Sequence, residues 1–474
     1  MPSQTADLAV SPSNSVIEKQ NGHAASSASN GNENAHPADL LQPSPSTLSA
    51  AENVSVEPNQ SKVSAMFGIL KKVMGVKDII NLRLSLPAQL LDPIPNLEHW
   101  NFMDRPDFFV RMSDPEDPLD RMLNVFKWWI AKDIKHVEYR VCKPFNSILG
   151  EQFFCHWDVN SKEDQSISTE TQPNGNTATA TTTSANADGE DNLRVEYITE
   201  QISHHPPISA YCYRCKEKNI EAVGLDHMSA KFSGISATVS PGSYCHGTFV
   251  TLKNRDNEMY QCLHAPATVA GWLTGSLRLH FTDCSHIICA DQNMALILEY
   301  KEGGWFSKAK DLVEGKIIKY EQGTLPKTVE GWKLKDIPKS AKVLATISGS
   351  WRGQVFVTKV SSSGNSSSAS SKKNSNNPKD LFIELPKMKA LEKLVKPLGE
   401  QHELESRKVW NPVIEKMLNN QFGEATKAKR AIEDAQRQKA ADREKMGEKF
   451  VPQIFEPLPD NGIPVLLPNA PINV

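Results

Sequence analysis

The chain has 474 residues, 39% of them hydrophobic, and a formal net charge of −3. This charge argues against general nucleic-acid binding, and no apolar run approaches the roughly 18 residues that span a bilayer. The N-terminus lacks a signal-type hydrophobic block, and the eight cysteines are scattered, as is typical of reduced thiols in the cytosol. We therefore expect an intracellular, soluble protein whose membrane contacts are peripheral.

Three stretches have compositions that do not support a packed core. Residues 1–60 are rich in Ser, Asn, Ala and Pro and contain almost no aromatic side chain. Such a segment cannot bury enough apolar area to offset the entropy that is lost on ordering, so we expect it to be disordered. Residues 161–191 and 361–378 are also of low complexity and lie between strand-like segments, which predicts disordered loops rather than domain linkers.

The first ordered element is predicted to be an amphipathic helix that begins near Ser61 and ends by Gly75. Its apolar residues follow the i, i+3, i+4, i+7 spacing of one helix face. They are Val63, Met66, Phe67, Leu70, Val73 and Met74. Because lysines flank this stripe, three interpretations stay open: packing into the core, a helix on a membrane surface, or a lid over a cavity.

A second helix and a long series of strands follow. Residues 119–130 carry apolar side chains on one helix face, and Pro118 suits the start of that helix. From His136 the apolar period changes to two. Strand-like segments occupy residues 136–141, 193–198, 211–213, 247–252, 294–298, 316–320 and 353–357. Their short connectors predict antiparallel neighbours in one large sheet, which tends to curl, and a wide barrel can enclose a ligand cavity.

The C-terminal part is predicted to return to helix. Asn411 and Pro412 fit the N-cap and the first position of one helix, and an apolar face follows them. A second helix is predicted from about Glu424 to Met446. The tail beyond Glu456 is rich in proline and is expected to be extended.

The usual sequence signatures of enzymes and metal sites are missing. The chain contains no P-loop, no dinucleotide-binding glycine pattern after a strand, no nucleophile elbow and no HExxH helix. One motif, Cys212-x-x-Cys215, has a zinc-like spacing, but strand alternation points its two thiols to opposite faces. We therefore expect no catalytic residues, no metal and no cofactor.

Two polar groups lie at predicted turns. The first is His204-His205, which follows a strand-like run and precedes two prolines that stiffen the turn. The second is Lys143 with Asn146, in a turn that Pro and Gly bound and where both side chains can point the same way. Taken singly, neither group is specific, because surface histidines and turn lysines are common.

A third polar group is the stripe Lys429, Glu433 and Arg437 on the last predicted helix, where steps of four residues share one face. Alone, such a stripe is usually a solvated ion-pair ladder. Together with the histidines and the turn lysine, it supplies the charged donors that a phosphate group needs. In such a site Glu433 would hold the two cations in position or accept hydrogen bonds from ligand hydroxyls.

Residues 200–207, Glu-Gln-Ile-Ser-His-His-Pro-Pro, resemble the signature of the oxysterol-binding protein-related family of lipid transfer proteins, with Ile202 where Val is usual. Residues 143–151 resemble that family's second motif, and the stripe from Lys429 to Arg437 resembles its C-terminal helix motif. The resemblance covers residues 61–456 and leaves 457–474 as a proline-rich tail. It implies an α+β fold, a large incomplete antiparallel β-barrel that encloses a lipid cavity, with a lid at 61–85 and flanking N- and C-terminal helices.

The resemblance also implies lipid binding and exchange without a chemical step. Phosphatidylinositol 4-phosphate would place its headgroup at the barrel mouth. By matched motif, the headgroup residues would be Lys143, Asn146, His204, His205, Lys429, Glu433 and Arg437. Ser236 would line the cavity, and the stripe between Val63 and Met74 would belong to the lid. The second lipid would be a sterol or phosphatidylserine, and residues 207–211 lean towards phosphatidylserine.

No pleckstrin-type domain or ankyrin repeat is visible, so the chain resembles a short member of the family. We expect a cytoplasmic protein that contacts membranes peripherally, at the endoplasmic reticulum, the Golgi or the plasma membrane. Two alternatives stay open. One is a lipid sensor that binds without net transport, and the other is a phospholipid-modifying enzyme that uses the histidines for acid–base work.

Overall fold

The computed structural model describes residues 88, 91–137, 143–160, 192–233, 236–270, 278–301, 311–360, 380–459 and 461–474. All of them belong to one compact unit, Ala50–Val474, whereas the other unit, Met1–Ser49, lies outside the described residues. The predicted disordered regions 1–60, 161–191 and 361–378 and the predicted lid, 61–85, also lie outside them.

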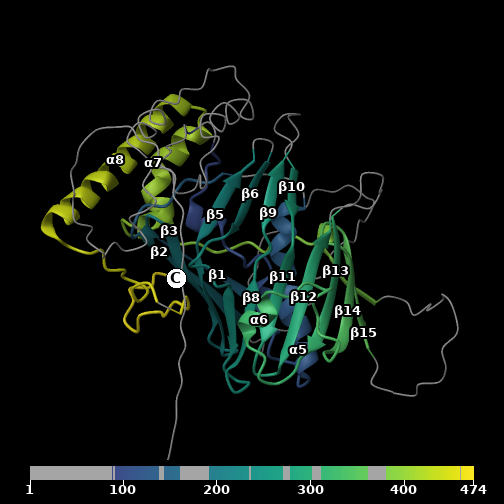
Figure 1. The fold of residues 1–474 in the computed structure, drawn as a ribbon. Coiled ribbons are helices and arrows are strands. Elements are labelled where there is room, and N and C mark those ends of the chain that lie inside the picture. The colour runs from purple at the N-terminus through teal and green to yellow at the C-terminus, as the bar shows by residue number, and fades with distance from the viewer. Residues whose placement is uncertain are drawn as a thin grey trace, which may run out of the picture. The chain divides into compact units, whose positions relative to one another are not determined.

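Within the described ranges, twelve antiparallel strands form one sheet (Figure 1). In spatial order they are β1 (Gln152–Asn160), β2 (Asn192–His204), β3 (Pro207–Cys215), β4 (Ile220–Asp226), β7 (Thr248–Leu252), β8 (Glu258–Leu263), β11 (Cys284–Cys289), β12 (Met294–Lys301), β13 (Leu312–Lys319), β14 (Lys342–Ser350), β15 (Gln354–Lys359) and β16 (Asp380–Glu384). The first and last strands of this order do not pair, so the sheet stays open. This confirms the prediction of a large antiparallel sheet that does not close completely.

A smaller antiparallel sheet has the order β10 (Arg278–Phe281), β9 (Ala267–Ala270), β6 (Ser236–Pro241) and β5 (Met228–Phe232). In the described ranges, the helices precede the first strand or follow the last one in the sequence, except α6, which lies between β13 and β14. They are α3 (Asn96–His99), α4 (Pro106–Phe109), α5 (Pro118–Ala131), η3 (Lys132–His136), α6 (Pro326–Glu330), η5 (Leu385–Lys387), η6 (Leu398–Glu400), α7 (Ser406–Leu418) and α8 (Phe422–Met446), where η marks a 3₁₀ helix.

Helix α5 starts as its sequence predicts and fills the main core. Pro118 takes the first helical position, and the Asp117 carboxylate accepts hydrogen bonds from the N–H groups of Leu119 (2.7 Å) and Asp120 (3.2 Å). The apolar face of α5 belongs to the same buried cluster as inward side chains from the strands of the twelve-stranded sheet. Figure 1 shows α5 behind β12 to β14, so the sheet covers this helix.

The other face of the sheet has its own core. Alternation along β3 puts Cys215 in the cluster around α5 and Cys212 in a second cluster, so the two thiols point to opposite faces as predicted. Ile454 and Phe455 of the C-terminal segment are buried in that second cluster. The proline-rich tail beyond them packs on the same face through partly buried apolar side chains. The tail is therefore part of the folded domain.

Two predicted boundaries are wrong. Helix α7 begins at Ser406, so Pro412 lies inside the helix instead of at its start. The first turn forms because Ser406 and Trp410 are buried and bonded to another part of the chain, which outweighs the cost of an internal proline. The strand predicted from His136 is a 3₁₀ helix as far as that residue, and residues 138–142 lie outside the described ranges. The guanidinium of Arg352 donates hydrogen bonds to the carbonyls of His136 and Val137 and holds this turn.

We predict that Gly224→Ala destabilises the fold by about 1–3 kcal/mol, because the new methyl group overpacks the core. A Cβ at this position would lie 2.3 Å from the hydroxyl oxygen of Tyr211 and 2.9 Å from the carbonyl oxygen of Gly247. The Tyr211 hydroxyl cannot move freely, since it lies 2.7 Å from the Thr248 hydroxyl in a buried hydrogen bond.

The matched control is Gly423→Ala, where a Cβ meets nothing within 4 Å. Since alanine favours helix, the control should leave the free energy of unfolding unchanged or raise it by up to about 1 kcal/mol. Urea unfolding monitored by tryptophan fluorescence measures both variants. Equal stabilities of Gly224→Ala and the wild type would contradict the packing described for β3 and β4.

Candidate functional site

The two adjacent histidines lie at the tight turn between β2 and β3 (Figure 1). His204 ends β2 and is partly buried, whereas His205 is exposed, and their ring centroids are 4.6 Å apart. The peptide bond between His205 and Pro206 is cis. The hydroxyl of Ser203 donates to the Pro206 carbonyl at 2.7 Å and closes the turn. The turn therefore holds both imidazoles beside each other at one end of the sheet.

An irregularity in β2 immediately precedes this turn. The register with β3 shifts between Gln201 and Ser203. The buried Gln201 side chain fills the irregularity, because its Oε1 accepts from the Ser209 hydroxyl at 2.6 Å and its Nε2 donates to the Ser203 carbonyl at 2.5 Å. A glutamine satisfies both neighbours here because it carries an acceptor and a donor.

The turn that carries Lys143 and Asn146 is bonded directly to the histidine strand. The N–H of Gly150 donates to the Gln201 carbonyl at 2.9 Å, and the Gln201 N–H donates to the Glu151 carbonyl at 2.8 Å. Gly150 has a φ of +80°, which glycine adopts without strain. Within the turn, Lys143 Nζ donates to Asn146 Oδ1 at 2.8 Å, so these two predicted site residues are in contact.

A buried carboxyl group attaches this turn to helix α7. The Glu151 side chain is fully buried and accepts hydrogen bonds from the Ser406 hydroxyl (2.6 Å), the Trp410 indole N–H (3.0 Å) and the Ile148 N–H (2.9 Å). Burial raises the pKa of Glu151 to about 7, although these three donors favour the charged form and oppose the shift. The attachment therefore depends on a carboxyl whose pKa lies near neutral pH.

Helix α8, which carries the third polar group, contacts the Lys143 turn. The Nε2 of Gln436 donates to the Leu149 carbonyl at 3.2 Å, and Ala425 is buried in one cluster with Phe145. Lys429 is 3% exposed and pairs with Glu433 at 2.5 Å, and burial lowers the pKa of this lysine. Arg437 is exposed and pairs with Asp434.

The structure thus joins the segments that carry the seven predicted headgroup residues. The predicted cavity residue, Ser236, lies in the smaller sheet. Ser236 is the first residue of β6, and its hydroxyl lies 2.7 Å from the Ser233 hydroxyl. The six residues of the predicted lid stripe lie outside the described residues.

The sequence reasoning missed Glu200. Its fully buried carboxylate accepts the backbone N–H groups of Gln453 (2.8 Å), Ile454 (2.9 Å) and Phe455 (3.3 Å). Burial raises the pKa of Glu200, and the three N–H groups oppose this shift. The sequence signal for a buried Glu200 is its position between Ile198 and Ile202, because the three side chains point to the same face of the strand. Glu200 ties the C-terminal segment to the strand that ends in the histidines.

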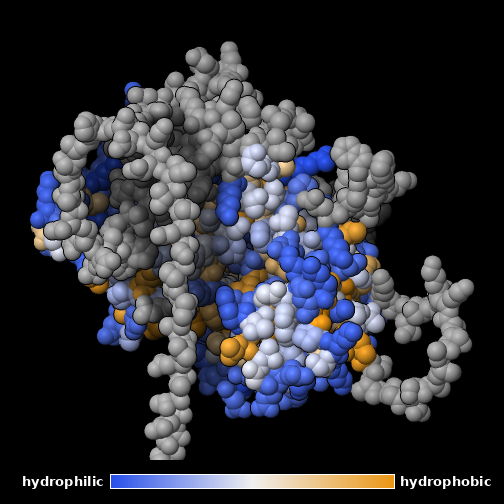
Figure 2. Space-filling view, viewed as in Figure 1, coloured by the Kyte–Doolittle hydropathy of each residue, from blue (hydrophilic) through white to orange (hydrophobic). Residues whose placement is uncertain are grey.

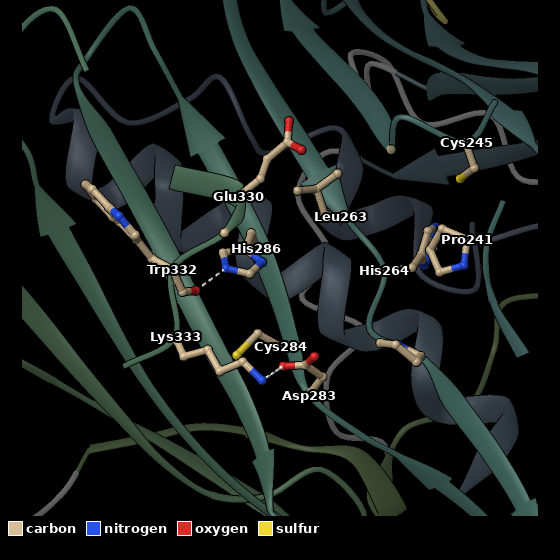
Figure 3. A pocket seen from close by; sticks show the side chains of 13 residues that line it. Pro241, Cys245, Leu263, His264, Asp283, Cys284, His286, Glu330, Trp332 and Lys333 are labelled. Carbon is tan, nitrogen blue, oxygen red and sulfur yellow. Dashed lines mark hydrogen bonds and ion pairs between the residues drawn. The ribbon is translucent and has the colours of Figure 1, made fainter. Parts of the chain in front are cut away.

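A pocket of about 330 Å³ lies elsewhere, beside α6 and β11 (Figure 3). His286 Nε2 lies 2.7 Å from the Trp332 carbonyl oxygen, and Lys333 pairs with Asp283 at 2.8 Å. None of the predicted site residues lines this pocket. Glu330, which also lines the pocket, is bonded to Lys327 and Gln261 outside it, whereas the buried Nε2 of His264 has no hydrogen-bond partner among the described residues.

Two properties of the described residues bear on the type of site. No group of three or more His, Cys, Asp or Glu side chains in these ranges is arranged to hold a metal ion. In the same part of the chain, no helix combines the length and the apolar character that a membrane span requires.

Comparison with known proteins gives consistent results. The family model described as oxysterol-binding protein matches residues 65–462. Oxysterol-binding protein-like protein 1 of Schizosaccharomyces pombe is 32% identical over 482 residues, which cover 86% of this chain and 90% of that protein. Among solved structures, the Osh1 ORD domain in complex with cholesterol superimposes with a TM-score of 0.57 at 19% identity, covering 86% of this chain and 85% of that one. The Osh3 ORD of Saccharomyces cerevisiae in complex with PI(4)P gives a TM-score of 0.56 at 16% identity, covering 87% and 91%.

We predict that Glu151 makes stability fall as the pH rises towards neutrality. The pKa of its carboxyl is about 7 in the folded state and 4.5 ordinarily, so the folded state binds the proton more tightly. The stabilisation is complete below pH 4.5 and is lost as the pH rises through about 7, amounting to about 3 kcal/mol. Glu151→Gln should remove this dependence, because an amide oxygen can accept from Trp410 and Ile148 while the Ser406 hydroxyl accepts from the amide N–H.

Urea unfolding of both proteins between pH 4.5 and pH 8 tests this prediction. The control is Glu403→Gln, since the side chain of Glu403 is 91% exposed and should leave the pH profile unchanged. Parallel profiles for the wild type and Glu151→Gln would show that the carboxyl titrates normally.

Proposed function

Because the chain belongs to the oxysterol-binding protein family, we propose that it binds phosphatidylinositol 4-phosphate and exchanges it for a second lipid between membranes. The headgroup would bind where the histidine turn, the Lys143 turn and helix α8 meet. The observation that carries this proposal is the bonded contact between these three segments, through Gln201 to Gly150 and through Gln436 to Leu149.

The chemistry of the meeting segments suits a phosphate monoester. Lys143, Lys429 and Arg437 contribute positive charge, and His204 and His205 contribute imidazoles that donate hydrogen bonds when protonated. A guanidinium binds two phosphate oxygens at once, whereas an ammonium acts as a point charge. We assign Asn146 and Glu433 to the same site because each contacts one of its lysines, at 2.8 Å and 2.5 Å respectively.

Two kinds of ligand in proteins of this fold support the exchange. One similar domain was solved with PI(4)P, and another was solved with cholesterol and, separately, with ergosterol. We infer that this chain also uses one cavity for two lipids, the second being a sterol or phosphatidylserine. Ser236 and the stripe between Val63 and Met74 are proposed to contact the lipid as cavity lining and lid.

The physical benefit of such a cavity is large. Moving a lipid from a bilayer into water costs about 0.8 kcal/mol for each exposed CH₂ group, which makes unaided transfer slow. An apolar interior removes most of that cost, and the headgroup site determines which lipid is taken. We propose that the protein works in the cytoplasm and contacts the endoplasmic reticulum, the Golgi or the plasma membrane peripherally.

We predict that His204→Ala combined with His205→Ala reduces extraction of phosphatidylinositol 4-phosphate from liposomes by about 100-fold or more. Two hydrogen bonds to a charged group are lost, each contributing about 1.5–3 kcal/mol. Sedimentation of liposomes after incubation with the protein measures the extracted lipid. The matched control replaces His156 and His246, which lie outside the three polar segments.

Unchanged extraction by the double variant would exclude the headgroup assignment. A donor-to-acceptor liposome assay then separates a carrier from a sensor, because a sensor binds the lipid without delivering it. Products of phosphoinositide turnover in the same mixture would instead indicate an enzyme.

A further inference from the structure

One threonine of helix α8 bonds to a backbone group far away in the sequence. The Thr426 hydroxyl donates to the Phe422 carbonyl at 2.8 Å, a common bond for a threonine in a helix, which leaves its oxygen free to accept. It accepts the N–H of Ala88 at 3.1 Å. Ala88 is fully buried, in one apolar cluster with Trp410 and Ala425. The Ala88 N–H therefore depends on this hydroxyl for its hydrogen bond.

A few residues further along the chain, the backbone is bonded to the turn that carries Lys143. The Asp92 N–H donates to the Lys143 carbonyl at 3.0 Å, and the Phe145 N–H donates to the Ile94 carbonyl at 3.2 Å. Pro95 and Phe145 form a parallel bridge. The chain from Asp92 to Pro95 therefore lies along the Lys143 turn.

The two attachments are close together in the sequence. Four positions separate Ala88, which is bonded to α8, from Asp92, which is bonded to the Lys143 turn. Four residues of chain span at most about 14 Å, and the Leu91 N–H shortens this path by donating to the Ala88 carbonyl at 3.0 Å. A displacement of Ala88 on α8 would therefore be transmitted to the backbone of Lys143.

Thr426 also shares a face of α8 with the charged stripe. Steps of three and four residues lead from Thr426 to Lys429, Glu433 and Gln436, so these four side chains lie on one side of the helix. At the far end of this face, Gln436 Nε2 donates to the Leu149 carbonyl at 3.2 Å. The pair of Lys429 with Glu433 thus lies between two attachments of α8.

Helix α8 has little apolar packing that could hold it in place without these bonds. Within Phe422–Met446, Ala425 and Lys429 are buried, and Ala428 and Ile432 are partly buried in the same cluster as Ala88. Figure 2 shows hydrophilic side chains at the outer end of the helix, at the left edge of the view. The position of α8 on the domain therefore depends strongly on its hydrogen bonds.

Loss of the Thr426 hydroxyl would leave the Ala88 N–H buried without an acceptor. Because an unpaired buried donor is unfavourable, the chain would move until this N–H reached another acceptor or water. Such a movement shifts Ala88 relative to α8, and with it the Lys143 turn relative to Lys429. A site that binds one phosphate through several groups needs those groups placed to within about 0.5 Å.

We propose that Thr426 is a positioning residue of the candidate headgroup site, which fixes the placement of Lys143 relative to Lys429 through Ala88 and Asp92. This inference rests on the proposed function, since it assigns both lysines to one phosphate. Thr426 carries no charge, and it acts on the ligand through the backbone that it holds.

The test compares Thr426→Val, which removes the hydroxyl, with Thr426→Ser, which keeps it. Extraction of phosphatidylinositol 4-phosphate from liposomes should fall about tenfold in Thr426→Val, as expected for one lost hydrogen bond, and should stay within about twofold of the wild type in Thr426→Ser. The matched control, Thr248→Val, removes a buried hydroxyl contact with Tyr211 outside the three polar segments. It should lower the urea unfolding midpoint without lowering extraction.

Hydrogen–deuterium exchange measures the same coupling without a lipid. Thr426→Val should speed exchange in the peptides that contain Asp92 and Phe145, whereas Thr426→Ser and Thr248→Val should leave it unchanged. The inference is overturned if Thr426→Val leaves exchange at Phe145 unaffected, or if Thr426→Val and Thr248→Val lower extraction equally. Normal extraction by Thr426→Val would overturn this inference alone. A wild type that extracts no phosphatidylinositol 4-phosphate would overturn the proposed function and this inference with it.

Discussion

The buried carboxyl group of Glu151 holds the C-terminal helices to the sheet. None of the groups that donate hydrogen bonds to it is a cation. Glu151 satisfies its two oxygens with a hydroxyl, an indole N–H and a backbone N–H, all from groups that are themselves fixed in place. A buried acceptor left without these donors would cost free energy comparable to several hydrogen bonds. This attachment fixes helix α7 on the Lys143 turn, and backbone bonds to Gln201 and the Gln436 contact join that turn to the histidine strand and to α8.

A second buried acid has the complementary role on the outer face. Glu200 gathers three consecutive N–H groups of the C-terminal segment, and this contact covers a hydrophobic surface that strand alternation would otherwise expose. Both acids lie close to the histidine turn, one attached through Gln201 and one within the same strand. The turn is thus supported on both faces of the sheet.

Sequence patterns predicted the local features well where a single chemical cause dominates. Asp117 and Pro118 start α5 in the expected way, and the alternation of Cys212 and Cys215 follows the strand period. The start of α7 was missed because a distant partner, Glu151, stabilises the turn before Pro412. Strand β1 escaped notice because it is buried on both faces over its first four residues, which hides the alternating pattern. The contact between the segments that carry the three polar groups follows from no local rule, since these segments are far apart in the sequence. Only their joint suitability for a phosphate group and the family resemblance suggested it.

The cations of the proposed headgroup site are already paired with other side chains of the protein, and this pairing affects how a ligand would bind and dissociate. Lys143, Lys429 and Arg437 already hold Asn146, Glu433 and Asp434. A phosphate in the proposed site would have to compete with these acceptors, so binding becomes an exchange of partners. A doubly charged monoester competes better than a singly charged diester, which makes the site a filter for charge state. On release, the buried Lys429 returns to its own carboxylate instead of being left bare, which lowers the cost of letting a lipid go.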